Sequence, residues 1–116
     1  MNIDKVKWKQ RCFLLHSFLY YKLDESIIGD SQYDRLCKDM IAAMKEVPFD
    51  PLGHVGPYDA LCCRAGEIGS GYYIKDYPIE IQTTALRVLW IHKQKTLGLE
   101  ETFSQFISRW GYKILD

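Results

Sequence analysis

Residues 19–36 read LYYKLDESIIGDSQYDRL, and this stretch decides the fold because it lies between two helical patterns. Before it, apolar side chains recur at helical spacing and predict a helix over about residues 3–22. The members of this stripe are Trp8, Cys12, Leu15 and Leu19, with Phe13, His16 and Tyr20 on an adjacent stripe. Gly29 then breaks the pattern, and Asp30 or Ser31 is expected to be the N-cap of a second helix.

The second helix has the clearest pattern in the chain. Pro48 and Pro51 end it, because a proline restricts the residue before it and cannot continue a helix. Its apolar side chains fall on one face: Tyr33, Leu36, Cys37, Met40, Ile41 and Met44. The connecting loop of about seven residues is short, so we expect the two helices to pack antiparallel, as a hairpin over residues 1–47.

The rest of the chain, residues 48–116, is predicted to be a loop-rich segment followed by two helices. Residues 57–65 favour a short helix that ends at Gly66. The spacing Gly66-x-x-Gly69-x-Gly71 lacks the lysine of a phosphate-binding loop and indicates a flexible turn. A short strand or β-hairpin at residues 72–74 stays open.

Two C-terminal helices complete the prediction. One covers about residues 79–97 and is stopped by Gly98, and the other ends at Gly111, with Glu100 and Glu101 near its N-terminus, where they suit the helix dipole. Its apolar face comprises Leu99, Phe103, Phe106, Ile107 and Trp110. The sequence thus predicts a mainly α protein with a single domain over residues 1–116.

Composition narrows the class of partner and the compartment. Fifteen basic residues balance fifteen acidic ones in 116 residues, which disfavours non-specific binding to nucleic acid. No apolar run approaches the roughly 20 residues of a membrane span, and the N-terminal segment lacks the apolar core of a signal peptide. The four cysteines have no zinc-site spacing, so we expect reduced thiols in the cytoplasm. No spacing supports a Cys62–histidine nucleophile.

The hairpin end carries the functional signal. An antiparallel hairpin brings the end of the first helix and the start of the second together, so two phenol rings and two or three carboxylates could line one cleft, from among Tyr20, Tyr21, Asp24, Asp30, Tyr33 and Asp34. Aromatic faces attract a flat cation, and carboxylates accept hydrogen bonds from hydroxyl or amide groups. The nicotinamide riboside end of NAD⁺ fits this description. Plainer roles stay open, with Asp30 as an N-cap and Tyr33 as a core residue.

The same residues carry a family resemblance. Residues 16–44 resemble the N-terminal Ia domain of bacterial NAD-dependent DNA ligases, whose pattern is approximately Y-[YH]-x-[LM]-D-x-x-x-I-[SP]-D-x-x-Y-D-x-L. The resemblance implies that Tyr20 and Tyr33 flank the nicotinamide ring and that Asp30 and Asp34 contact the ribose and amide side. Tyr21 stands where the family has His or Tyr. The chain departs from the pattern at Gly29, where the family has Ser or Pro.

The resemblance does not extend to catalysis. The ligase nucleophile is the lysine of a K-x-D-G motif, whereas residues 22–25 read Lys-Leu-Asp-Glu and lack the glycine. We therefore predict a protein that is not an enzyme by itself. The leading hypothesis is a non-catalytic interaction or regulatory protein with a protein partner, of the kind that phages and mobile elements use to inhibit a host system. The alternatives are a module that binds NAD or nicotinamide mononucleotide, and an accessory subunit of a split ligase-type adenylation domain.

Overall fold

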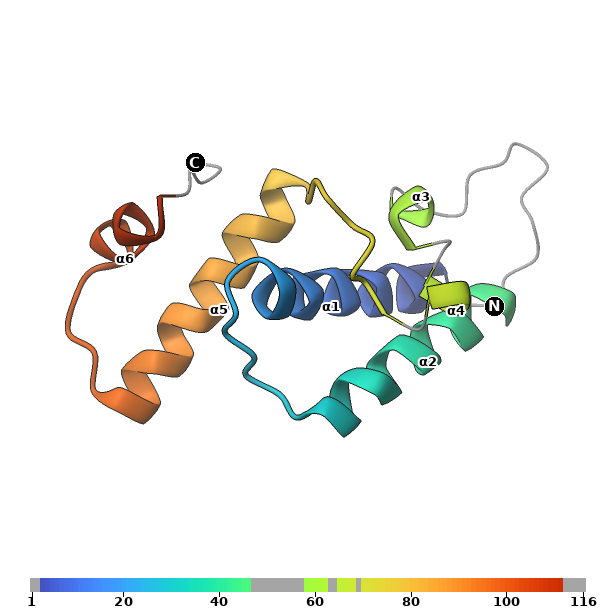
Figure 1. Ribbon diagram of the computed structural model, residues 1–116, viewed down its shortest axis with the longest axis horizontal. Coiled ribbons are helices and arrows are strands. Elements are labelled where there is room, and N and C mark those ends of the chain that lie inside the picture. Colours follow the sequence, from blue (N-terminus) through green and yellow to red (C-terminus); the bar gives the residue numbers. More distant parts are fainter. Residues whose placement is uncertain (1–2, 47–57, 63–64, 69, 112–116) are drawn as a thin grey trace.

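The fold is mainly α, as predicted. The computed structural model describes residues 3–46, 58–62, 65–68 and 70–111. Its helices are α1 (Ile3–Tyr21), α2 (Asp30–Glu46), α3 (Asp59–Cys62), α4 (Ala65–Ile68), α5 (Ile79–Leu97) and α6 (Phe103–Trp110). Figure 1 shows α2 returning beside α1 so that the end of α2 lies near the start of α1, which confirms the helical hairpin.

Helix α1 lies at the centre of the molecule and packs against α2, α5 and α3. Its buried positions therefore extend around much of the helix and include two polar side chains: Val6, Gln10, Phe13, Leu14, Ser17, Phe18 and Leu19. The prediction of one apolar stripe was wrong at Trp8, which is 66% exposed. A helix covered on several sides has no single apolar stripe from which its core face can be read.

Helix α2 follows its predicted face, but its start differs. Tyr33, Cys37 and Met40 are buried against α1. The helix begins at Asp30 itself, so neither Asp30 nor Ser31 is the N-cap. The Gly29 N–H donates to the Gln32 side-chain oxygen at 2.8 Å, which satisfies the backbone at the helix start. Asp30 then contributes a carboxylate to the first turn, where it suits the helix dipole.

The segment between the hairpin and α5 differs most from its prediction. In place of one short helix over 57–65, two short helices form, and Gly66 lies inside α4 rather than after a helix end. Positions 57, 63, 64 and 69 lie outside the described residues. Residues 72–74 form no strand in the described part of the chain, because the Ile74 N–H closes a turn onto the Gly71 carbonyl at 3.0 Å.

Gly71 marks a close approach of the turn to side chains of α1. A Cβ at this position would lie 2.8 Å from Ser17 Cβ, with Ser17 Oγ nearer still, and 3.3 Å from the Phe13 ring. Only glycine lets the turn reach α1 this closely, so this contact is the reason for a glycine at position 71. The turn is thereby seated on the middle of α1.

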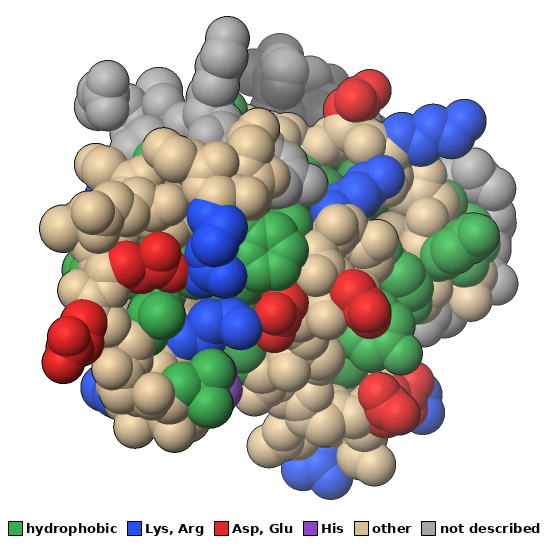
Figure 2. Space-filling model, turned by 60° about the vertical axis from the view of Figure 1, so that its left-hand side comes forward, with side chains coloured by type: hydrophobic (Ala, Val, Ile, Leu, Met, Phe, Trp, Pro, Cys, Tyr) green, Lys and Arg blue, Asp and Glu red, His purple; other side chains and the backbone are tan. Residues whose placement is uncertain are grey.

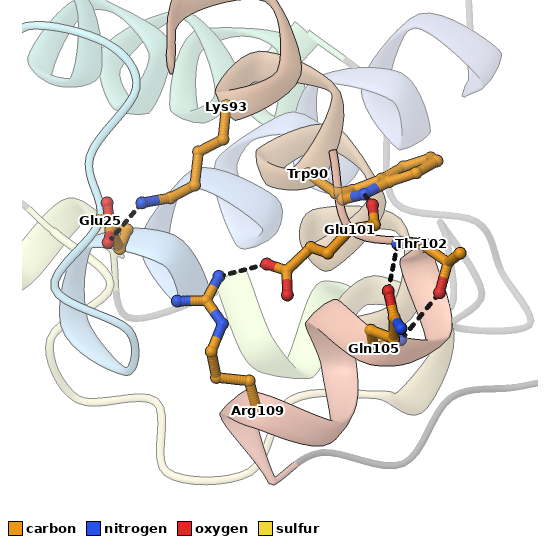
Figure 3. A network of polar contacts seen from close by, with 7 residues as sticks. All are labelled: Glu25, Trp90, Lys93, Glu101, Thr102, Gln105 and Arg109. Atoms are coloured by element: carbon orange, nitrogen blue, oxygen red, sulfur yellow. Dashed lines mark hydrogen bonds and ion pairs between the residues drawn. The ribbon is translucent and has the colours of Figure 1, made fainter. Parts of the chain in front are cut away.

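The C-terminal half follows its prediction closely. Helix α5 ends at Gly98 and α6 at Gly111, both with positive φ. A capping box of Thr102 and Gln105 starts α6, and Leu99 lies ahead of that helix instead of on its face. Glu101 also precedes α6; its carboxylate pairs with Arg109 at 2.6 Å and its carbonyl accepts from Trp90 Nε1 at 2.9 Å (Figure 3).

One ion pair joins the hairpin loop to α5. Lys93 Nζ lies 3.0 Å from Glu25 Oε1, and both side chains are largely shielded (Figure 3). Just before it, Asp24 adopts the left-handed region (φ 53°), which aspartate tolerates better than most residues, and the Glu25 N–H donates back to the Leu19 carbonyl at 2.9 Å. The loop that follows α1 is thus fixed at both its start and its contact with α5.

We expect Gly71→Ala to lower the free energy of unfolding by about 1–3 kcal/mol, the usual cost of overpacking a tight contact. Urea unfolding followed by circular dichroism measures it. Gly29→Ala is the matched control, because a Cβ there meets nothing closer than 3.8 Å. The control should lose at most about 1 kcal/mol, through the poorer start of α2. Equal losses in the two variants would contradict the close approach at Gly71.

Candidate functional site

Three of the five predicted site residues meet at the hairpin end. The rings of Tyr20 and Tyr21 lie 4.7 Å apart between centroids, and Tyr33 lies 5.9 Å from Tyr20 and 6.3 Å from Tyr21. A fourth ring, Tyr72 from the turn before α5, contacts Tyr21 edge-on at 5.6 Å. We call Tyr20, Tyr21, Tyr33 and Tyr72 the tyrosine cluster. Tyr72 was not among the predicted site residues, because its approach depends on the turn seated on α1.

Tyr33 is the buried base of the tyrosine cluster. It is 8% exposed, and its hydroxyl lies 2.7 Å from Ser17 Oγ and accepts the Gly71 N–H at 3.0 Å. Its ring stacks on both Phe13 (6.0 Å, 22°) and Tyr20 (5.9 Å, 15°). Burial raises the pKa of the Tyr33 phenol to about 12, although the hydrogen bonds from Ser17 and Gly71 oppose the rise.

This stacking bears on the predicted nicotinamide site. A ring held between Tyr20 and Tyr33 needs them about 7 Å apart, twice the carbon–carbon contact distance of roughly 3.5 Å. The observed 5.9 Å leaves no room for a third ring. The rings that water can reach are the outer ones, Tyr20 at 38% exposure and Tyr72 at 75%. The tyrosine cluster therefore presents an outer aromatic surface rather than an open slot.

The two predicted carboxylates lie on the exposed side of α2. Asp30 and Asp34 are both exposed. Asp34 forms an ion pair with Lys38 one turn along the helix, at 2.9 Å. Such exposed i, i+4 pairs contribute little to stability. Asp34 thus has a structural partner that the sequence reading did not foresee.

A cavity that sequence reasoning missed lies on another side of α1. Its volume is about 540 Å³, and α1 and α5 supply most of its lining, with Tyr58 adding to it. From α1 come Trp8, Cys12 and Leu15, three of the four residues of the predicted apolar stripe. The stripe therefore borders this cavity, and its surroundings depend on α5 as well as on α1. The lining residues from α5 lie more than 60 positions after those from α1, which is why the sequence alone did not indicate the cavity.

The titratable groups near this cavity are not tuned for nucleophilic chemistry. Burial raises the pKa of the Cys12 thiol, with Lys9 opposing, whereas an activated cysteine needs a lowered pKa. Burial lowers the pKa of His16, so its imidazole is neutral at pH 7. Cys62 is buried in the core, and His54 lies outside the described residues. Within the described part of the chain, no group of three or more His, Cys, Asp or Glu side chains could hold a metal ion.

The molecular surface matches the neutral composition. On the face drawn in Figure 2, acidic and basic side chains are interspersed rather than gathered into a patch of one sign. None of the helices in the described residues is both long and apolar enough to span a bilayer.

No protein-family model matches the chain, and neither the curated proteins nor the solved structures contain a match. The resemblance to the ligase Ia domain therefore rests on the residues between 16 and 44 that carry its pattern.

We expect the protein to lose stability as pH rises from about 10 to about 12, partly through Tyr33. Its pKa is higher in the folded chain than in the unfolded one, so the unfolded state releases the proton first and is favoured over that range. The contribution, about 3 kcal/mol from a rise of two pKa units, is fully present below pH 10. Unfolding in urea at pH 8 and pH 11 should show a smaller loss in Tyr33→Phe than in the wild type. An identical pH dependence in both proteins would contradict this assignment.

Proposed function

We propose that this chain is a non-catalytic interaction protein and that the outer rings of the tyrosine cluster dock a partner protein. The supporting observation is the layering of the cluster: Tyr20 and Tyr72 are exposed, while Tyr33 beneath is buried and hydrogen-bonded. Tyrosine supplies large, rigid contact area with little conformational entropy to lose, and it is enriched among the residues that dominate protein interfaces.

The chemistry of the remaining groups supports a binding role. The pKa values of Cys12 and Cys37 are raised by burial, which disfavours a thiolate nucleophile at either position. The chain also lacks the K-x-D-G motif of the ligases that the hairpin resembles. An inhibitor of a host system, of the phage or mobile-element type, is the role that we predicted by analogy with small proteins of that kind, and no residue of this chain carries the analogy. It stays a prediction until a target is known.

A nicotinamide-binding module is the second candidate, because Tyr20, Tyr21 and Tyr33 do come together at the hairpin end. Binding between Tyr20 and Tyr33 would require the two rings to separate. Calorimetric titration with nicotinamide mononucleotide distinguishes the candidates: micromolar binding that Asp34→Ala abolishes would favour the nucleotide. An accessory subunit of a split ligase would instead restore adenylate transfer from NAD⁺ to a ligase core whose own hairpin is deleted.

The docking proposal predicts that Tyr20→Ser combined with Tyr72→Ser weakens partner binding by about tenfold or more, as loss of interface hot spots does. Partners captured from cells that carry the gene would be identified by mass spectrometry, and the affinity for each purified partner then measured. Leu97→Ser is the matched control: Leu97 is 71% exposed and lies at the end of α5, outside the cluster. Its affinity should equal that of the wild type.

If the double variant captures the same partners with unchanged affinity, the tyrosine cluster is not the docking surface. Loss of binding in the Leu97→Ser control would point to α5 instead. Both variants replace exposed side chains, so circular dichroism should show unchanged helicity.

A further inference from the structure

The cavity between α1 and α5 has the features of a small-molecule site. Its volume of about 540 Å³ lies in the range of ligand pockets, roughly 300–1,000 Å³. The apolar part of its lining comes from Leu15, Ile81 and Val88, together with the indole of Trp8. Trp8 is 66% exposed, so a bound molecule could cover a large apolar side chain that otherwise faces water.

Polar groups on the cavity wall are few and of opposite charge. The Tyr58 hydroxyl donates to Glu80 Oε1 at 3.0 Å, and the Arg11 guanidinium hydrogen-bonds the same phenol. Both Arg11 and Glu80 are exposed and retain hydrogen-bonding capacity, because a guanidinium has five N–H donors and a carboxylate about four acceptor sites. A ligand here therefore meets one cation and one anion side by side.

His16 adds an uncharged polar group to this wall. Its Nδ1 atom is buried and has no hydrogen-bond partner among the residues that the structure describes. This atom is itself inaccessible, so other atoms of His16 line the cavity and Nδ1 is not a contact for a ligand.

We propose that this cavity binds a small, uncharged, mainly apolar molecule that carries an amide-like edge with one donor and one acceptor. The apolar body lies against Leu15, Ile81 and Val88. The edge accepts from Arg11 and donates to Glu80, as an amide does. A ligand with a single full charge gains little, because the attraction of an anion to Arg11 is offset by Glu80 and that of a cation to Glu80 is offset by Arg11. This site lies apart from the tyrosine cluster and does not depend on the function proposed for it.

Three probes of matched shape test the charge argument: 2-naphthamide, 2-naphthoate and 2-naphthylmethylammonium. In NMR titrations of the full chain, 2-naphthamide should shift the Trp8 indole and His16 ring resonances in a saturable manner, with millimolar affinity or better for a probe of this size. The two charged probes should bind about tenfold more weakly or worse, since each faces one like charge and cannot satisfy both polar groups. Equal affinity for all three probes, or no saturable binding, would overturn the proposal.

A pair of substitutions on one helix tests the location. Thr84 lines the cavity and Thr96 does not, yet both are exposed residues of α5. Their hydroxyls donate alike to the carbonyl four residues earlier, at 2.8 and 2.9 Å. Thr84→Trp should fill the cavity and abolish 2-naphthamide binding, whereas Thr96→Trp should bind as the wild type does. Undiminished binding in Thr84→Trp would overturn the site. So would a wild-type dimer that Thr84→Trp dissociates, because the groove would then be an interface between copies.

Discussion

The hydroxyl group of Tyr33 is the constraint on which the arrangement of the hairpin depends. It joins α2 to Ser17 of α1 and to the backbone of Gly71, three segments that are far apart in the sequence. A buried hydroxyl without partners costs about 1–3 kcal/mol, so these bonds favour one packing of the three segments over others. Ser17 is fully buried, and only glycine can approach it at position 71. This packing therefore requires a small polar side chain at position 17, a phenol at position 33 and a glycine at position 71.

The same constraint shapes the surface that we propose to be functional. Because Tyr33 is held by its hydroxyl and stacked on Phe13, its ring forms a fixed floor for Tyr20. The turn at Gly71 brings Tyr72 against Tyr21, which adds an exposed ring to the cluster. Tyrosine side chains have few rotatable bonds and therefore lose little entropy on binding. The cavity on another side of α1 uses different residues, so one central helix supports two separate surfaces.

The sequence predicted best what local chemistry decides. Helices α5 and α6 end at glycines with positive φ, and α2 has a single apolar face, so spacing and stop signals placed all three. The predictions failed at positions whose surroundings come from distant segments of the chain. Trp8 follows the spacing of a core residue but lines a cavity completed by α5. The sequence also did not indicate why position 71 is a glycine, because the reason is Ser17, more than fifty positions earlier. At the candidate site, the meeting of Tyr20, Tyr21 and Tyr33 was predictable from the hairpin, whereas the approach of Tyr72 and the closed stack were not.

The most direct test of the account is the hydrogen exchange of the Gly71 amide, measured by NMR in the wild type and in Tyr33→Phe. The account predicts that this amide is protected in the wild type, since it donates to a buried phenol. In Tyr33→Phe it should exchange much faster, while amides in the middle of α5 remain protected and show that the protein is folded. Rapid exchange of Gly71 in the folded wild type would contradict the account, because the turn would then not be held by Tyr33.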